Sequence, residues 1–166
     1  RVGIPSFLTT LAMMGIAKGA AIWISDTAAV PILNQSYAWI FGGGSIGRIP
    51  VLLFWVLILG AIGHIALRRT GFGRRVLATG GGETAARYSG IDTARIKFRV
   101  LVLSSVAAAL AGMLYAGRLQ SGRFQLGEGD ELSVIAAAVL GGTSLFGGKG
   151  TVIGTVVGAM MIGMIN

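Results

Sequence analysis

Five apolar runs follow one another along the chain. The first three cover residues 7–25, 50–67 and 100–117, and 50–67 is free of charged side chains. As an α-helix it would extend roughly 27 Å, about the thickness of a bilayer's hydrocarbon core. The fourth run, 132–146, is interrupted by two glycines, and the fifth begins at residue 151. The pattern predicts an all-α, polytopic bundle of transmembrane helices whose fourth member is short, broken or re-entrant.

Charged residues concentrate between the second and third runs. Residues 68–99 carry seven arginines and Lys97 against Glu83 and Asp92, so this segment holds eight of the chain's 14 basic residues. The preceding loop contains one acid and one base, and the loop before the fourth run contains two arginines and three acids. Short loops rich in Lys and Arg stay in the cytoplasm during insertion. We therefore expect 68–99 to be cytoplasmic and the other two loops to lie outside.

Composition supports a membrane protein and argues against several other classes. Hydrophobic residues make up 54% of the chain and charged residues 12%, against about 25% charged residues in typical soluble domains. The net charge of +8 is local and has few interleaved aromatics, so we expect no nucleic-acid binding. The chain has no cysteine and one histidine, His64, which excludes thiolate and multi-histidine metal sites. The apolar runs also hold no paired acids or nucleophile–histidine pair, so we do not expect an enzyme.

Three glycine-rich segments resemble nucleotide-binding motifs without meeting their requirements. Residues 42–47 and 80–85 match the G-x-G-x-x-G/A spacing, but neither lies in a βαβ pattern. Residues 142–151 resemble a phosphate-binding loop, yet Thr143 stands where glycine is needed and Gly150 where serine or threonine is needed. We expect no cofactor in this chain. If transport is driven by ATP, another subunit must bind the ATP and Mg.

Small residues recur at helical spacing in the third and fifth runs. Gly150, Gly154 and Gly158 lie four residues apart, and Gly112 belongs to a similar row in the third run. Such rows allow the backbones of two membrane helices to approach closely. We expect these glycines to mark helix-packing faces, and we favour plain packing over a sliding contact.

Residues 80–91 predict a short helix inside the basic segment. The glycines at 80–82 would form a flexible lead-in, Glu83 suits the positive end of the helix dipole, and Gly90 is a natural terminator. Ala85 and Ala86 would leave a smooth surface for another protein. The alternative, a helix lying on lipid headgroups, would need more large apolar residues.

Lys18, Trp39 and Gln120 are candidate residues of a solute pathway. Lys18 lies within an apolar run, so it must snorkel, pair with an acid or line a wet path, and we favour pairing or snorkelling. Trp39 and Gln120 lie on the expected outer side, where they either contact solute or anchor the chain at the interface. The acidic residues at 128–131 either meet an external partner or complement the dipole of the next helix.

Several segments together resemble a known family. Residues 70–75 and 78–91 resemble the cytoplasmic loop of the ribose/xylose-type sugar permeases of bacterial ABC importers, and 135–150 resemble that family's second signature. Residues 5–11 and the pair 18–19 resemble its mid-chain segment, with Lys18 in place of the usual arginine. The resemblance extends over essentially the whole chain.

The resemblance implies a fold and a set of partners. Residues 1–166 would form one transmembrane permease domain, the C-terminal half of a longer permease whose N-terminal helices and last span are missing here. It would lie in the bacterial inner (plasma) membrane with a second permease copy, cytoplasmic ATPase subunits and a periplasmic sugar-binding protein. The short helix would be a cytoplasmic coupling helix resting on the ATPase. Its coupling residues would be Glu83, Thr84, Ala85, Ala86, Arg87 and Gly90.

The function implied by the resemblance is import of a monosaccharide, driven by ATP hydrolysis in the partner subunit. Two alternatives stay open: a permease for another small polar solute such as a nucleoside or a branched-chain amino acid, and a membrane pore or scaffold that does not use ATP. The sequence leaves open the sugar, a homodimer or heterodimer of permeases, and the topology of 132–150.

The charge pattern makes a testable prediction about orientation. A cysteine replacing Arg87, in a chain without native cysteines, should not react with a membrane-impermeant thiol reagent in intact cells, because Lys/Arg-rich loops are retained inside. A cysteine replacing Arg48 should react in the same cells. Labelling of position 87 without permeabilisation would contradict the predicted topology.

Overall fold

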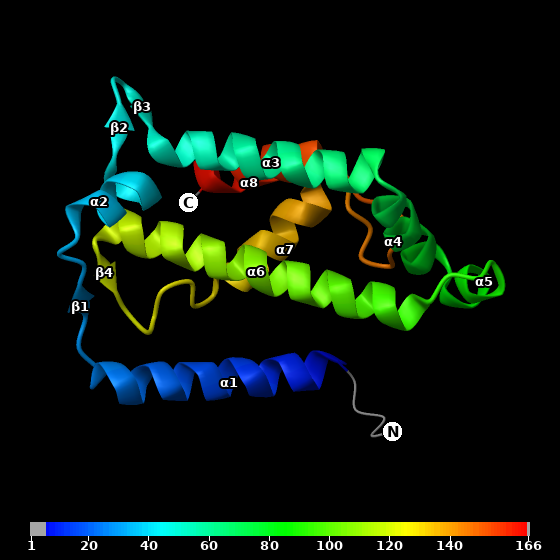
Figure 1. Cartoon of the computed structure of the whole chain (residues 1–166), viewed down its shortest axis with the longest axis horizontal. Coiled ribbons are helices and arrows are strands. Elements are labelled where there is room, and N and C mark those ends of the chain that lie inside the picture. The colour runs from blue at the N-terminus through cyan, green and yellow to red at the C-terminus, as the bar shows by residue number, and fades with distance from the viewer. Residues whose placement is uncertain (1–5, 166) are drawn as a thin grey trace.

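Three long helices form the frame of the molecule. The computed structural model describes residues 6–165. Within that range α1 (Ser6–Ser25), α3 (Val51–Arg69) and α6 (Thr93–Leu119) are long and apolar enough to cross a membrane. They lie lengthwise in Figure 1, with successive helices running in opposite directions. The first three predicted spans are thus confirmed, and the structure is an all-α bundle. We call the end that carries 70–92 the basic end.

The fourth and fifth apolar runs form shorter helices. α7 (Asp130–Leu140) has 11 residues and α8 (Val152–Ile165) has 14. At 1.5 Å per residue, α7 extends only about 16 Å, roughly half a hydrocarbon core. It begins beside the middle of α6 and runs obliquely toward α3, while α8 lies behind α3 (Figure 1). The fourth run is therefore short and ends at Gly141–Gly142, as the glycines predicted.

Glycines allow α7 and α8 to meet backbone to backbone. A Cβ on Gly154 would overlap the carbonyl of Gly141, and one on Gly158 would overlap the carbonyl of Ala137. The Thr151 hydroxyl donates to the Gly141 carbonyl at 2.8 Å. This close backbone approach at Gly154 and Gly158 follows the small-residue rule for membrane helices.

Two other glycines predicted for helix packing make no such close contact within the described chain. Gly150 precedes α8, where an added Cβ would make only ordinary contact with the Thr143 side chain at 3.6 Å. Gly112 faces open space within the described chain, so its packing role stays a prediction. Gly117, five residues later in α6, packs against the backbone and side chain of Phe41 instead.

The end opposite the basic end is built from short elements. α2 (Gln35–Ala38) leads into a π-helical turn, η1 (Trp39–Gly43), which packs on the last turns of α6. β1 (Val30–Pro31) pairs with β4 (Ser121–Gly122), and β2 (Ser45–Ile46) pairs with β3 (Ile49–Pro50). The rings of Tyr37, Phe41 and Trp55 are stacked in sequence, with centroids 4.8 and 5.8 Å apart. These contacts tie together the chain segments that follow α1 and precede α3.

The basic end contains more helix than the sequence predicted. α3 continues to Arg69, α4 (Gly71–Gly81) follows at once, and α5 (Glu83–Tyr88) precedes α6. The Thr70 hydroxyl caps α4 by accepting from the backbone N–H of Gly73 at 3.2 Å. Gly80 and Gly81 lie in the last turn of α4, so the expected flexible glycine lead-in is wrong. Only Gly82 lies between the two helices.

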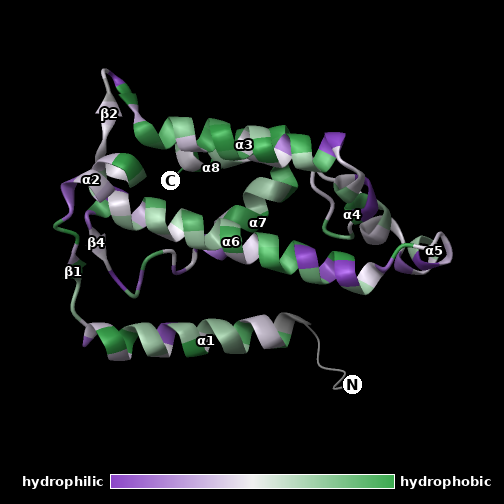
Figure 2. Cartoon of the chain, in the orientation of Figure 1, coloured by the Kyte–Doolittle hydropathy of each residue, from purple (hydrophilic) through white to green (hydrophobic). Residues whose placement is uncertain are grey.

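Apolar side chains cover the outside of the frame. None of the residues in the apolar windows of α1 and α3 is buried, and of the 27 residues of α6 only Thr93, Ile96 and Gly117 are. Figure 2 shows hydrophobic residues along these helices and hydrophilic ones at the end of α3 and the start of α6. Continuous exposed apolar surface of this extent marks contact with lipid or with other apolar helices. The structure is therefore a membrane-embedded arrangement.

The α7–α8 contact yields a stability prediction. Gly158→Ala should destabilise the protein by about 1–3 kcal/mol, because the added methyl group overpacks a backbone contact. Gly163→Ala, in the same helix but facing open space, is the matched control and should be neutral or stabilising. Thermal unfolding in detergent, followed by tryptophan fluorescence, measures both. Equal shifts in the two variants would contradict the packing account.

Candidate coupling site at the basic end

α5 is a short, sharply bounded helix at the far tip of the basic end (Figure 1). Gly82 enters it in an extended conformation, and Glu83 lies in its first turn. At its other end the N–H of Gly90 donates to Arg87 O at 2.9 Å and the N–H of Ile91 to Ala86 O at 3.0 Å. Gly90 has φ +79°, so this is a Schellman termination. The predicted terminator role of Gly90 is confirmed.

One side of α5 packs on the start of α6. Ala86 is 4% exposed and Ile96 is 5% exposed. The prediction that Ala86 shares a free surface with Ala85 is therefore wrong, because Ala86 is buried while Ala85 remains exposed. Thr84 and Arg87 also lie on the exposed side. These three residues form the accessible part of the predicted coupling set.

Tyr88 is the most prominent feature of the exposed side. Its side chain is 93% exposed, in the last turn of α5. Aromatic side chains are among the commonest anchors of protein interfaces, because they bury large area at low entropic cost. Tyr88 does not belong to the coupling set predicted from the sequence. Its position directly before the Ser89–Gly90 helix end was the signal available.

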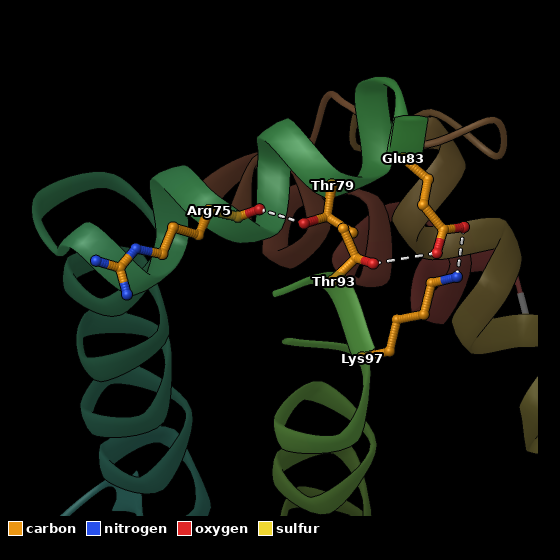
Figure 3. Close-up of polar contacts among 5 residues, drawn as sticks. All are labelled: Arg75, Thr79, Glu83, Thr93 and Lys97. Atoms are coloured by element: carbon orange, nitrogen blue, oxygen red, sulfur yellow. Dashed lines mark hydrogen bonds and ion pairs between the residues drawn. The ribbon is translucent and has the colours of Figure 1, made fainter. Parts of the chain in front are cut away.

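Polar contacts fix α5 to α6. The Lys97 ammonium lies 2.6 Å from Glu83 Oε2, and the Thr93 hydroxyl donates to Glu83 Oε1 at 3.2 Å. Figure 3 shows the carboxylate of Glu83 between these two partners, with Thr79 bonded to the Arg75 carbonyl beside them. Both carboxylate oxygens are thus engaged by α6. We call Glu83, Thr93 and Lys97 the α5–α6 clamp.

The clamp changes the ionisation of Glu83. The hydrogen bond from Lys97 is the main cause that lowers the pKa of the Glu83 carboxyl below its ordinary value of 4.5. The positive charge of Lys97, the Thr93 hydroxyl and the positive charge of Arg87 also lower this pKa, whereas desolvation raises it. Lys97 and Thr93 could not be identified as partners from the sequence, because the non-helical residues 89–92 separate α5 from α6 and no periodic pattern extends across them.

A second contact joins the basic end to the α7–α8 connection. Gly80 and Gly81, at the end of α4, lie against the backbone of Gly147 and Gly148. Gly147 and Gly148 have positive φ angles of 87° and 76°, which glycine adopts readily. An added Cβ on Gly80 would lie 2.8 Å from the nitrogen of Gly148. Two glycine-rich segments that are far apart in sequence therefore meet here.

The three candidate pathway residues are not brought together as one site. Lys18 of α1 forms an ion pair with Glu128, which precedes α7. This matches the favoured pairing of Lys18. Gln120 Nε2 lies close to the end of η1, 3.5 Å from where a Cβ of Gly43 would be, and Trp39 begins that same turn. Trp39 and Gln120 thus share the end opposite the basic end.

Acidic residues do not gather into a cation site in the part of the chain that the structure describes. No group of three or more His, Asp or Glu side chains in residues 6–165 could hold a metal ion.

Comparison with known families gives one match over the entire chain. The family model described as "Branched-chain amino acid transport system / permease component" matches residues 1–166.

Three individual relatives are bacterial permeases named for ribose or arabinose. The ribose import permease protein RbsC of Bacillus subtilis (strain 168) is 40% identical over 96% of this chain and 50% of its own length. RbsC of Escherichia coli (strain K12) is 39% identical over 98% of this chain and 52% of its own. The L-arabinose transport system permease protein AraH of Escherichia coli (strain K12) is 38% identical over all of this chain and 50% of its own. The chain spans about half the length of these relatives. No solved structure matches it.

The clamp makes a prediction about pH. Because the pKa of Glu83 is lowered, its stabilising contribution is fully present above the unfolded-state pKa and is lost as pH falls through the lowered value. In Lys97→Met the pKa of Glu83 should return toward 4.5, since the main cause of its lowering is removed. In Arg95→Met it should not change, because Arg95 pairs with Asp92. Carboxyl-carbon NMR titration of Glu83 in micelles measures this. An unchanged pKa in Lys97→Met would contradict the clamp.

Proposed function

The chain belongs to the permease family of branched-chain amino acid and sugar ABC importers, and from this premise we propose that it forms part of the transmembrane pathway of an importer for a monosaccharide. The identity of 38–40% to permeases named for ribose and arabinose supports a pentose-like cargo. The proposed assembly contains a second permease copy, cytoplasmic ATPase subunits that bind ATP and Mg, and a periplasmic sugar-binding protein. The proposed location is the bacterial inner membrane, with 68–99 in the cytoplasm.

The observation that carries this proposal is the form of α5. It is a short helix with a defined start and end, placed at the tip of the molecule beyond the apolar parts of α3 and α6 (Figures 1 and 2). A docking element must be rigid and accessible, and α5 combines a Schellman termination with an exposed Tyr88. We propose that Thr84, Ala85, Arg87 and Tyr88 contact the ATPase, and that Glu83, Ala86 and Gly90 hold the helix in shape.

The proposed mechanism is a change between two packing arrangements. Closure of the ATPase subunits around ATP would displace α5, and the helices attached to it would move between inward-open and outward-open states. Small-residue contacts such as that between α7 and α8 are compatible with a close, well-defined packing in each state. Trp39 and Gln120 are proposed to meet the solute at the outer end, and the Lys18–Glu128 pair is proposed to hold α1 beside the segment before α7.

A second cargo class has specific support. The matching family model is described by branched-chain amino acid transport, so a permease for such an amino acid is the runner-up. Uptake by the assembled importer in proteoliposomes distinguishes the two. Competition by unlabelled ribose or arabinose, and not by leucine, supports a sugar importer; the reverse result supports the runner-up.

Substitution of Tyr88 tests the coupling role of α5. Tyr88→Ala should lower ATP-driven uptake roughly tenfold, because truncating an aromatic anchor commonly costs 1–2 kcal/mol or more. Phe98→Ala is the matched control: its ring is 68% exposed on α6 and lies outside α5. Co-purification of the ATPase subunit should weaken in the first variant alone. Normal uptake and normal co-purification in Tyr88→Ala, and in Ala85→Trp tested beside it, would overturn the proposed docking surface.

A further inference from the structure

The basic end raises the question of which transmembrane helix follows α5 when it is displaced. α5 follows α4 after a single residue, Gly82, and packs against α4; the Gly82 N–H donates to the Ala78 carbonyl at 3.2 Å and the Ala86 N–H donates to the Gly82 carbonyl at 2.9 Å. Its attachment to α6 is different in kind, because it uses side-chain bonds: an ion pair and a hydroxyl–carboxylate hydrogen bond.

We propose that Lys97 is a positioning residue that, with Thr93, fixes the Glu83 carboxylate so that α5 and α6 move as one rigid unit. The inference rests on the proposed coupling role of α5 and specifies the helix through which displacement reaches the membrane. α6 is the longest helix described, 27 residues, and its first turns carry the clamp while its last turns pack on η1 at the opposite end. A displacement of α5 would therefore be carried along α6 to the outer end.

The geometry of the clamp supports a rigid connection between α5 and α6 and argues against a loose contact. The carboxylate accepts from two side chains, one on each oxygen, so it cannot rotate without breaking a contact. Thr93 is only 2% exposed, so its hydroxyl is held in place by the packing around it. Asp92 caps the start of α6 by accepting from the N–H of Arg95 at 3.1 Å, which stabilises the turn that presents Thr93 and Lys97.

Substitutions of Lys97 can distinguish a defect in passing the displacement of α5 to α6 from a defect in folding. Lys97→Met should keep thermal stability and ATPase co-purification nearly unchanged, because solvent-exposed ion pairs contribute little stability. Its ATP-driven uptake should fall roughly fivefold or more while ATP hydrolysis continues, in line with typical coupling free energies. Lys97→Arg should retain uptake, and the charge exchange Glu83→Lys with Lys97→Glu should recover most of it. Arg95→Met is the matched control, since this exposed base pairs within its own turn.

Three results would overturn the inference. Lys97→Met could transport as well as Arg95→Met, the charge exchange could be no better than its single substitutions, or Lys97→Met could lose the ATPase, which would place Lys97 in the docking surface instead. The Tyr88 variant keeps the two proposals apart: loss of uptake in Tyr88→Ala with normal uptake in Lys97→Met would preserve the coupling role of α5 and refute the clamp.

Spin labels give a test that does not depend on a Lys97 variant. Cysteines replacing Ser89, the C-cap of α5, and Arg99 on α6 would be the only thiols in the chain. In the assembled importer the distance between the labels should be the same with and without trapped ATP. A change in that distance between the two states would refute the rigid unit.

Discussion

The absence of water in the hydrocarbon layer constrains every element of this structure. Backbone N–H and C=O groups there must find partners within the protein, and an α-helix satisfies them within a single segment of the chain. α1, α3 and α6 are accordingly long and regular, and strands are confined to two-residue pairs at the end of the bundle. The irregular segments collect at the two ends or, as with the stretch before α7, lie beside α6. Hydrophobic burial, which organises soluble proteins, contributes little to holding these helices together, since their apolar side chains face outward.

Helix association must then come from close backbone contact and from a few polar bonds. Gly154 and Gly158 of α8 allow the close backbone contact. An added methyl group at either glycine would overlap a carbonyl of Ala137 or Gly141, at the end of α7. The polar bonds connect segments that share little packing: Lys18 links α1 to the stretch before α7, and Glu83 links α5 to α6. Both ion pairs are partly exposed, so each contributes more to geometry than to stability.

The sequence was sufficient wherever a local rule decides the outcome. The uncharged run at 50–67 predicted α3, the glycine pair at 141–142 predicted the end of α7, and Gly90 predicted the end of α5. The resemblance of 78–91 and 135–150 to sugar permeases agreed with the family match over the whole chain. Each of these predictions depends only on the hydropathy or the backbone freedom of one segment. None of them requires knowing which part of the chain packs beside that segment.

Properties that depend on a neighbour could not be predicted in the same way. Gly112 and Gly117 both lie on α6, and only the position of Phe41 decides which of them is packed. Ala86 is equivalent to Ala85 in the sequence pattern, and only the packing of α5 against its neighbours determines that Ala86 is buried. Lys97 and Thr93 were two polar residues among many in a basic segment, and their role follows from how α5 folds back onto the start of α6. The hydrophobic pattern locates helices but does not specify which polar side chains meet between them.

The two attachments of the basic end differ in a way that bears on motion. The clamp is directional, because a carboxylate held at both oxygens fixes distance and orientation together. The contact of Gly80 with Gly147 and Gly148 has no interdigitating side chains, so small displacements along it break no side-chain contact. If α5 docks on an ATPase as proposed, the clamp would link its displacement to α6 through bonds of fixed direction, whereas the contact with 147–148 is a close approach of two backbones. The two attachments would then respond differently to the same displacement, because a side-chain bond resists rotation while a backbone contact resists only closer approach.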